Sequence, residues 1–220
     1  MELVVLEIFQ IMLEKRWKMM ESLARFKSNK LRKGKVKKKM IIGNKDEFGF
    51  EIKKISDEDH ISELKMFVKG QNICAWKKEE EKRFKSVRWN LDDLIVYLNE
   101  TLSMLKTDDP FPFDVDGECA AEKDNNSREY EVNSDELMDE YYDKLNDWSY
   151  KHSWHHAGAG AILADVFFRK VKEGIEVSWW SDQTDEGIIF KNSFGFTVIP
   201  VSTYSMVISS FIDEYNGMWK

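Results

Sequence analysis

The sequence predicts an α+β fold in which an antiparallel sheet, built from hairpins, is packed by about three core helices. Segments that alternate between apolar and polar residues come in pairs joined by turn residues, which is typical of antiparallel hairpins. Helical segments fall between groups of strands rather than after every strand, which argues against a parallel βαβ order. Apolar residues make up 42% of the 220 residues and aromatic residues 13%, so the chain can bury a hydrophobic core.

The first 39 residues are predicted to form an amphipathic helix followed by a basic tether, and residues 40–220 to form a single α+β domain. The helix is indicated by apolar residues at steps of three and four. These residues are Leu6, Phe9, Leu13, Trp17, Met20 and Ala24. A helix this apolar needs another surface to cover it. One predicted arrangement is a homodimer in which this helix contacts a second chain. Glu2 and Glu7 interrupt the apolar run, which is too short to span a bilayer, and no signal-peptide pattern precedes it, so we expect a cytoplasmic protein with no transmembrane segment.

The tether concentrates positive charge. Its basic residues are Lys30, Arg32, Lys33, Lys35, Lys37, Lys38 and Lys39. Residues 1–40 have a net charge of +8, whereas the whole chain has a net charge of −7, so the body is strongly acidic. This asymmetry indicates two surfaces with different partners. The tether could bind nucleic-acid phosphates or an anionic membrane, but it contains no base-reading motif, and a solvated tail is equally consistent with it.

The first half of the body is predicted to contain short strands and one core helix. Strands are expected over 39–42, 48–52, 64–68 and 73–76, with Gly70-Gln71-Asn72 as the turn of a hairpin. A helix is expected to begin at Asn90, which can cap it, with Asp93 completing a weak capping box. Its buried stripe is Leu91, Leu94, Ile95, Leu98, Leu102 and Leu105.

An acidic stretch follows. Residues 108–143 carry fourteen Asp and Glu against two basic residues. We expect an acidic loop over about 108–134, mobile in its middle at 122–133, because this part is polar. Ser134 is expected to cap a second helix whose apolar residues recur up to Trp148 and His152, and which the region of Gly158 and Gly160 ends.

The clearest hairpin pairs 165–171 with 175–180 around Glu173-Gly174. Alternation places Trp179 and Trp180 on opposite faces, so one indole is expected in the core and the other at the surface, where it is the best candidate for a partner contact. A further strand over 194–199 and a last helix over 202–215 complete the domain.

Three of the four histidines, His152, His155 and His156, lie just before Asp165. On a continued helix His152 and His156 would share one face, as metal-binding histidines do, but the H-E-x-x-H motif requires Glu where Ser153 stands. A metal-dependent hydrolase or nuclease using His152, His156 and Asp165 is therefore an alternative. The favoured interpretation is that the histidines cap the helix end and hydrogen-bond across a turn, with no metal and no cofactor.

Other catalytic motifs are absent from the sequence. There is no G-x-S-x-G elbow, no P-loop and no G-x-G-x-x-G. Cys74 and Cys119 do not form a C-x-x-C pair, which argues against a zinc knuckle or redox motif and fits a reducing compartment.

Residues 64–215 resemble a group of bacterial proteins. The most specific part is His152-Ser153, then Ala164-Asp165-Val166 with Phe168-Arg169, then Glu176-Val177-Ser178-Trp179. Some members look linked to phage defence or mobile elements, and in some the module is joined to an ImmA/IrrE-type metallopeptidase domain. The resemblance implies a recognition or regulatory module. Peptidase activity is not carried over, because this chain contains no H-E-x-x-H.

The sequence therefore favours a noncatalytic interaction, sensor or regulatory module of a bacterial defence or mobile-element system, which binds another protein chain. The predicted contact residues are His152, His155, His156, Asp165, Arg169, Trp179 and Trp180. Two alternatives stay open, namely the metal-dependent hydrolase and nucleic-acid binding through the tether.

Overall fold

The computed structural model describes residues 39–57, 59–128, 135–158, 161–181 and 187–219. The predicted N-terminal helix and six of the seven tether cations lie outside these residues. The prediction of a homodimer formed through that helix therefore also concerns residues outside the described part of the chain. Lys39, the last of the tether cations, is the first described residue and begins strand β1.

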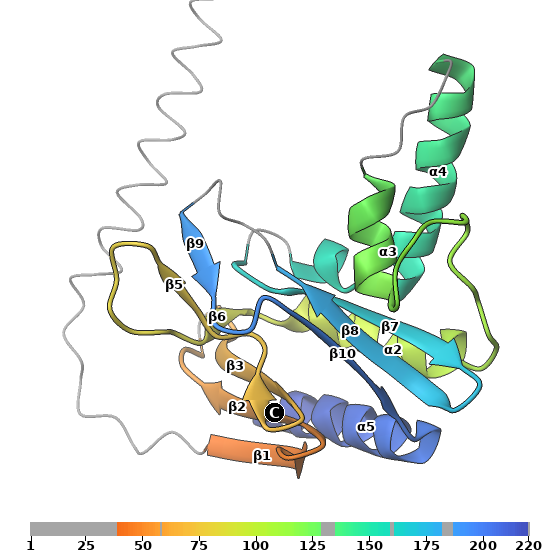
Figure 1. Cartoon of the computed structure of the whole chain (residues 1–220). Helices are drawn as coiled ribbons and strands as arrows, with labels where there is room; N and C mark the ends of the chain where they lie inside the picture. The colour runs from red at the N-terminus through yellow and green to blue at the C-terminus, as the bar shows by residue number, and fades with distance from the viewer. Residues whose placement is uncertain (1–38, 58, 129–134, 159–160, 182–186, 220) are drawn as a thin grey trace, which may run out of the picture. The chain divides into compact units, whose positions relative to one another are not determined.

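The first sheet is an antiparallel meander of β1 (Lys39–Asn44), β2 (Phe48–Lys54) and β3 (Ile61–Val68). Two short strands, β4 (Gln71–Asn72) and β6 (Val87–Asn90), both pair with β3. Strands β1, β2, β3 and β6 are labelled in Figure 1. The turn before β4 falls at Lys69 and Gly70, whose φ angles of 48° and 77° are those of a type I′ hairpin turn. A hairpin therefore follows β3 as predicted, but its turn is Lys69-Gly70 and its second strand is Gln71–Asn72, where the prediction had a turn over Gly70-Gln71-Asn72 and a strand over 73–76.

The second sheet has the order β10-β8-β7 and is antiparallel throughout. The predicted hairpin forms β7 (Asp165–Val171) and β8 (Gly174–Trp180), and β10 (Phe194–Ile199) pairs with the other edge of β8. A separate two-stranded ladder joins β5 (Trp76–Lys78) to β9 (Ile188–Phe190). The fold class is α+β with antiparallel sheets, as predicted.

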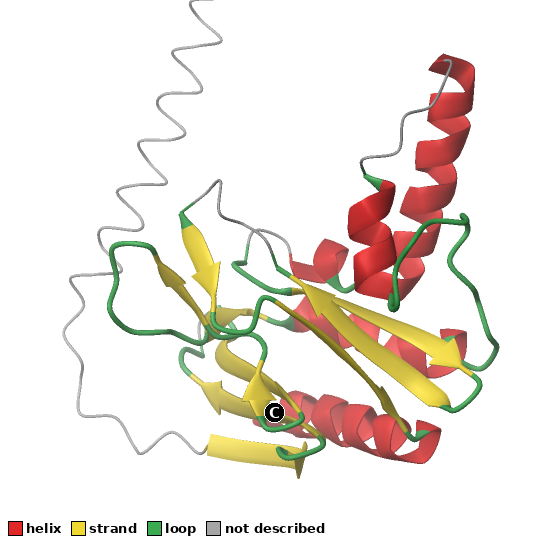
Figure 2. Ribbon diagram, viewed as in Figure 1, coloured by secondary structure: helices red, strands yellow, loops and turns green. Residues whose placement is uncertain are grey.

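Four α-helices complete the described fold. Figure 2 draws the helices in red. They are α2 (Asp92–Met104), α3 (Ala120–Ser127), α4 (Asp135–His152) and α5 (Val201–Met218), and a 3-10 turn, η1 (His155–Gly158), follows α4. Helices α2 and α5 pack on each other, and α5 also contacts β1, β2 and β8. None of the helices within the described ranges is both long enough and apolar enough to cross a bilayer.

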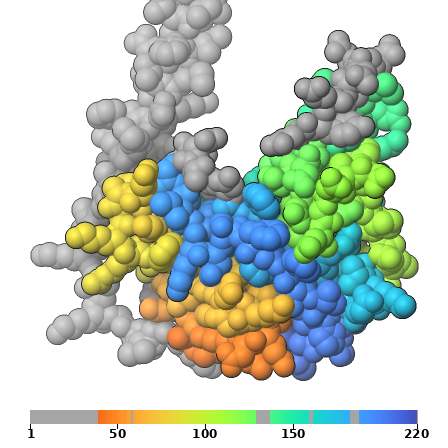
Figure 3. Space-filling model, in the orientation of Figure 1, coloured from red at the N-terminus to blue at the C-terminus, as the bar shows by residue number. Residues whose placement is uncertain are grey.

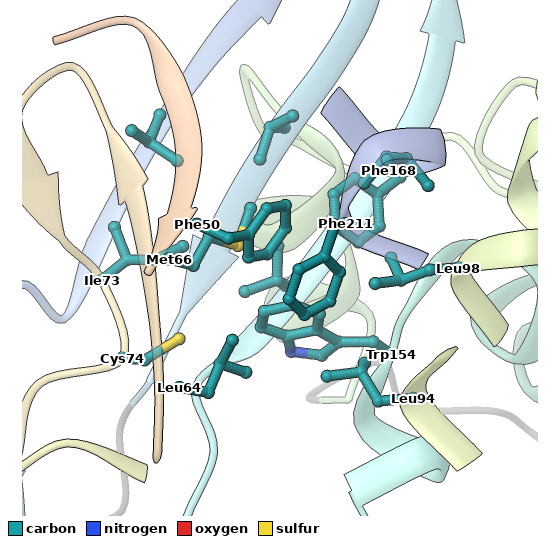
Figure 4. Packing of buried hydrophobic residues seen from close by; sticks show 14 of the residues in the cluster. Phe50, Leu64, Met66, Ile73, Cys74, Leu94, Leu98, Trp154, Phe168 and Phe211 are labelled. Carbon is teal, nitrogen blue, oxygen red and sulfur yellow. The ribbon is translucent and has the colours of Figure 1, made fainter. Parts of the chain in front are cut away.

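The main core unites the inner faces of both sheets with α2 and α5 (Figure 4). Phe50 of β2 stacks on Phe211 of α5 with their ring centroids 4.3 Å apart. Trp154, fully buried after the end of α4, donates a hydrogen bond from Nε1 to the Ala164 carbonyl at 2.6 Å and meets Phe168 edge to face. Each such buried aromatic contributes on the order of 2–3 kcal/mol of hydrophobic free energy.

A smaller second cluster lies on the opposite side of β7. It joins α3, α4 and the segment before α3 through these buried residues: Phe111, Cys119, Ala120, Ala121, Tyr141, Leu145, Trp148 and Phe167. Phe113 stacks on Tyr141 with centroids 4.1 Å apart, and Phe111 meets Trp148 edge to face.

Several local predictions were wrong. The stretch expected as an acidic loop contains helix α3, because Ala120 and Ala121 can pack closely on β8. Helix α2 begins at Asp92, since Asn90 belongs to β6, although the Asn90 side chain does accept the backbone N–H of Asp92 at 2.7 Å. Residues 73–75 connect β4 to β5 and do not form a strand.

Candidate interaction site

The histidines follow the end of α4 but serve different neighbours. Helix α4 ends at His152, so the continued helix that would align His152 with His156 is absent. His152 is buried; its Nδ1 lies 2.8 Å from the Phe168 carbonyl oxygen and its Nε2 lies 3.1 Å from a carboxylate oxygen of Asp109. Because the Phe168 carbonyl can only accept, Nδ1 is the donor there. His152 therefore holds the end of α4 to β7.

His155 and His156 lie on the exposed turn η1. His155 Nδ1 is 2.6 Å from Asp165 Oδ1, and this hydrogen bond raises the pKa of His155 above its ordinary value. Burial, followed by the positive charge of His155, lowers the pKa of His156. Their rings meet edge to face with centroids 5.6 Å apart.

The ligand set expected for a metal-dependent enzyme is not assembled. His152 is occupied by Phe168 and Asp109, whereas Asp165 pairs with His155, not with His156. Within the described ranges, no three His, Cys, Asp or Glu residues are grouped so that they could hold a metal ion. The structure thus does not assemble His152, His156 and Asp165 into the site that the metal-dependent alternative requires.

The cysteines are also placed as packing residues. Both are buried and unpaired. Burial raises the pKa of the Cys74 thiol to about 12 and also raises the pKa of Cys119. Because the thiolate is the reactive form, neither position favours a nucleophile near neutral pH.

Arg169 is held inside the fold, contrary to its predicted role as a contact residue. Its Nη2 lies 2.5 Å from Glu176 Oε2, and both side chains are largely buried. The other oxygen of Glu176 accepts the Ala120 backbone N–H at 2.6 Å, while Ser178 Oγ accepts that of Ala121 at 3.1 Å. Strand β8 therefore supplies the acceptors that the first turn of α3 needs.

A small polar cavity of about 60 Å³ lies where α3 meets the sheet. Asp124 is almost fully buried there and accepts hydrogen bonds from Ser149 Oγ at 2.6 Å and from Arg128 Nη2 at 2.8 Å. Asp165 and Trp180 also line the cavity. A cavity of this size has room for little more than water. Asp124 is already paired, so it does not need a ligand to satisfy its carboxylate.

The paired tryptophans divide as predicted, one in the core and one at the surface. Trp179 is buried, donates a hydrogen bond to the Asn192 carbonyl at 3.1 Å and covers Gly195, where a Cβ would lie 2.4 Å from the indole ring. Trp180 is only partly buried and meets Phe194 edge to face with centroids 5.1 Å apart.

Strand β10 extends this exposed aromatic surface into an apolar strip. Phe194, Phe196 and Val198 point to the same side of the strand and are 44%, 37% and 43% exposed. They lie opposite Trp180, Ser178 and Glu176 of β8, so they share the sheet face on which α3 sits. Helix α3 packs on β7 and β8 rather than on β10. In Figure 3, blue atoms of the region of β10 are visible between the green atoms of α3 and the yellow atoms around β5.

Two further features make β10 a candidate binding strand. Among the described strands it pairs only with β8, so it forms an edge of its sheet. Beside it lies a cavity of about 370 Å³ with an apolar lining that includes Trp180, Ile188 and Phe194. The sequence predicted this strand, and the alternation of Phe194, Phe196 and Val198 could have indicated that they share one face. Their exposure depends on where α3 lies, which the sequence does not reveal.

The fold and this site define an α+β protein in which, among the described residues, a partly exposed apolar strip lies on a strand at the edge of its sheet. Comparisons with protein-family models, with curated proteins and with solved structures gave no match.

Proposed function

We infer that this protein is a noncatalytic interaction module that binds an extended, apolar segment of another protein along β10. The observation that carries this proposal is the row of Phe194, Phe196 and Val198, exposed at alternate positions of an edge strand. Large apolar side chains are rarely left in a contiguous exposed row unless a partner covers them.

The chemistry of the strand favours a partner that adds a strand. Natural edge strands are commonly protected by lysine, proline or a bulge, but β10 contains none of these: its sequence FGFTVI carries no charge. An added strand satisfies the free backbone groups of the edge, and its alternate side chains occupy neighbouring pockets. The cavity lined by Trp180 and Phe194 provides such a pocket at one end of the strip.

The predicted contact surface changes accordingly. Trp180 remains in it, whereas Trp179, His152 and Arg169 act inside the fold. His155 and His156 lie on the turn η1, and Asp165 begins β7, where Trp180 of β8 separates it from Phe194 of β10 in the register of the sheet. A role in bacterial defence or in a mobile element rests on the sequence resemblance alone and is part of this proposal.

The test uses a display library of random twelve-residue peptides, selected on the immobilised full-length protein. We expect enrichment of peptides with apolar residues at every second position and no central proline. Synthetic copies should bind the protein in fluorescence polarisation, and Phe196→Lys should weaken binding at least tenfold, since it removes an apolar contact and buries a charge (about 1.4 kcal/mol or more).

The matched control is Val96→Lys, which places a lysine on another exposed apolar residue, on α2, and should leave binding unchanged. Circular dichroism and melting temperature check that both variants fold. Equal binding by the two variants, or selection without the alternating pattern, would overturn the proposal. A concentration-dependent dimer that Phe196→Lys dissociates, seen by sedimentation equilibrium, would assign the strip to a second copy and equally overturn it.

A further inference from the structure

The outer face of β1, β2 and β3 gathers lysines around one buried carboxylate. Glu51 of β2 is 5% exposed. Its carboxylate lies 2.9 Å from Lys39 Nζ, 2.5 Å from Lys45 Nζ and 2.6 Å from Lys65 Nζ. Each of these lysines comes from a different part of the meander, namely β1, the β1–β2 turn and β3, so the three ammonium groups converge on one point of the sheet.

The electrostatics leave this point positive. Burial alone raises the pKa of Glu51, but the hydrogen bonds from Lys45, Lys65 and Lys39 outweigh it and lower the pKa to about 2. Glu51 is therefore ionised at neutral pH, yet it can neutralise only one of the three positive charges. The Glu51 carboxylate also holds the three lysines in place, so they lose less conformational entropy when they bind an anion.

Positive charge continues across the same face. Lys53 lies directly opposite Lys39 in the register of β1 and β2, and Arg88 of β6 pairs with Glu63 of β3 at 2.8 Å. The paired positions of this face, together with Lys45, carry four lysines and one arginine against Glu51 and Glu63, and the turn that holds Lys45 adds two exposed acidic residues, Asp46 and Glu47. The face and this turn therefore keep a net positive charge of one on a chain whose overall charge is −7. Such a local reversal of sign marks a surface for an anionic partner.

We propose that the outer face of β1-β2-β3 binds the phosphate backbone of nucleic acid without reading base sequence. Neighbouring strands are about 4.8 Å apart, so the cations form a broad, shallow array that suits a chain of phosphates better than a single enclosed anion. Among the described side chains of this face, Ile41 is the large apolar one that is well exposed. A membrane surface is less favoured, because stable membrane binding needs more apolar area to insert.

This site differs from the predicted one. Nucleic-acid binding through the tether was one open alternative in the sequence, and of the tether cations Lys39 begins β1 and contacts Glu51. The residues that distinguish the face from the tether are Lys53 and Arg88, which lie far from the tether in sequence and outside the group around Glu51. They can be changed without disturbing that buried carboxylate.

The experiment measures binding of the full chain to a fluorescein-labelled oligothymidine of twenty nucleotides, by fluorescence polarisation over a series of salt concentrations. In the double variant Lys53→Gln/Arg88→Gln we expect binding to weaken about tenfold at about 50 mM salt and the slope of log K against log salt to become shallower by about 1.4. A control with the same change in charge, Lys106→Gln/Lys144→Gln, alters exposed lysines of other surfaces and should leave both values unchanged.

Three outcomes would overturn the proposal. Equal weakening by both double variants would mean that only net charge matters. Loss of binding in Lys33→Gln/Lys35→Gln, with no effect of Lys53→Gln/Arg88→Gln, would place the site on the tether. Binding to vesicles of phosphatidylcholine and phosphatidylserine, sensitive to Lys53→Gln/Arg88→Gln, without binding to the oligonucleotide, would make the partner a membrane.

Discussion

Two neighbouring histidines have opposite environments in this protein. His155 faces the carboxylate of Asp165, so its protonated form is stabilised and its pKa is raised. His156 lacks such a short carboxylate contact in the described structure, and burial together with the charge of His155 lowers its pKa. The pKa values of these adjacent histidines are therefore shifted in opposite directions, although both side chains are exposed at the surface.

The separation can be measured by NMR titration of the imidazole C–H signals. In Asp165→Asn, the pKa of His155 should fall towards its ordinary value, because the hydrogen bond to the Asp165 carboxylate is the largest cause of the raised pKa. In His155→Gln, the pKa of His156 should rise, because a neighbouring positive charge is gone. The Asp165–His155 pair stabilises the fold below the ordinary histidine pKa, and this contribution is lost as the pH rises through the raised pKa. An unchanged His155 titration in Asp165→Asn would contradict the assigned pair.

At the scale of elements, helix α3 depends on groups that another part of the chain supplies. Its sequence, AAEKDNNS, has few apolar residues, and its N-cap residue, Cys119, makes no side-chain cap. Glu176 and Ser178 of β8 accept the N–H groups of Ala120 and Ala121 instead. A carboxylate at this end is also favoured by the helix dipole.

Glu176→Gln should therefore lower the free energy of unfolding by about 2–4 kcal/mol, because it leaves Arg169 in a largely buried place without its counter-charge. Glu140→Gln is the matched control: it removes an exposed ion pair with Lys144 on α4 and should change stability by less than about 0.5 kcal/mol. Urea unfolding followed by tryptophan fluorescence measures both. Similar losses in the two variants would show that the Arg169–Glu176 pair is no more important than a surface pair.

The elements that the sequence predicted correctly are those with local signals. The hairpin of β7 and β8 has alternating apolar residues around Gly174, and α5 has its buried residues at helical spacing. Helix α3 was missed because its stability comes from β8, about 56 residues further along the chain. Strand β9 was missed for a similar reason, since three residues alone carry little pattern and its partner β5 lies over a hundred residues earlier.

The candidate site was predictable only in part, again for reasons of distance along the chain. Alternation separated Trp179 from Trp180, which the structure confirms. The partners of His152, the Phe168 carbonyl and Asp109, come from two distant segments, and no local pattern links them to α4. The convergence of Lys39, Lys45 and Lys65 on Glu51 likewise requires the register of three strands.

At the scale of the described domain, two hydrophobic clusters lie on opposite sides of β7. The larger one joins both sheets to α2 and α5, whereas the smaller one holds α3 and α4 against β7. Tyr141 connects the parts of the smaller cluster: its ring stacks on Phe113, and its hydroxyl donates to the carbonyl of Ser127 at the end of α3 at 2.9 Å. Regions that bury less apolar surface commonly open before the whole domain unfolds.

We therefore expect α3 to exchange its amide hydrogens through a partial opening with a lower free energy than the opening of β2, β3 and β8. Tyr141→Ala should lower the opening free energy of α3 by about 3 kcal/mol, since it removes a buried ring and its hydrogen bond, and should leave exchange in β2 and β3 unchanged. Leu98→Ala, a truncation in the main core, should instead speed exchange in every element that opens only by global unfolding. Hydrogen exchange read by NMR distinguishes these cases. If Tyr141→Ala speeds exchange equally in α3 and β2, the two clusters unfold as one unit and the outer face of β7 is not a separately stable layer.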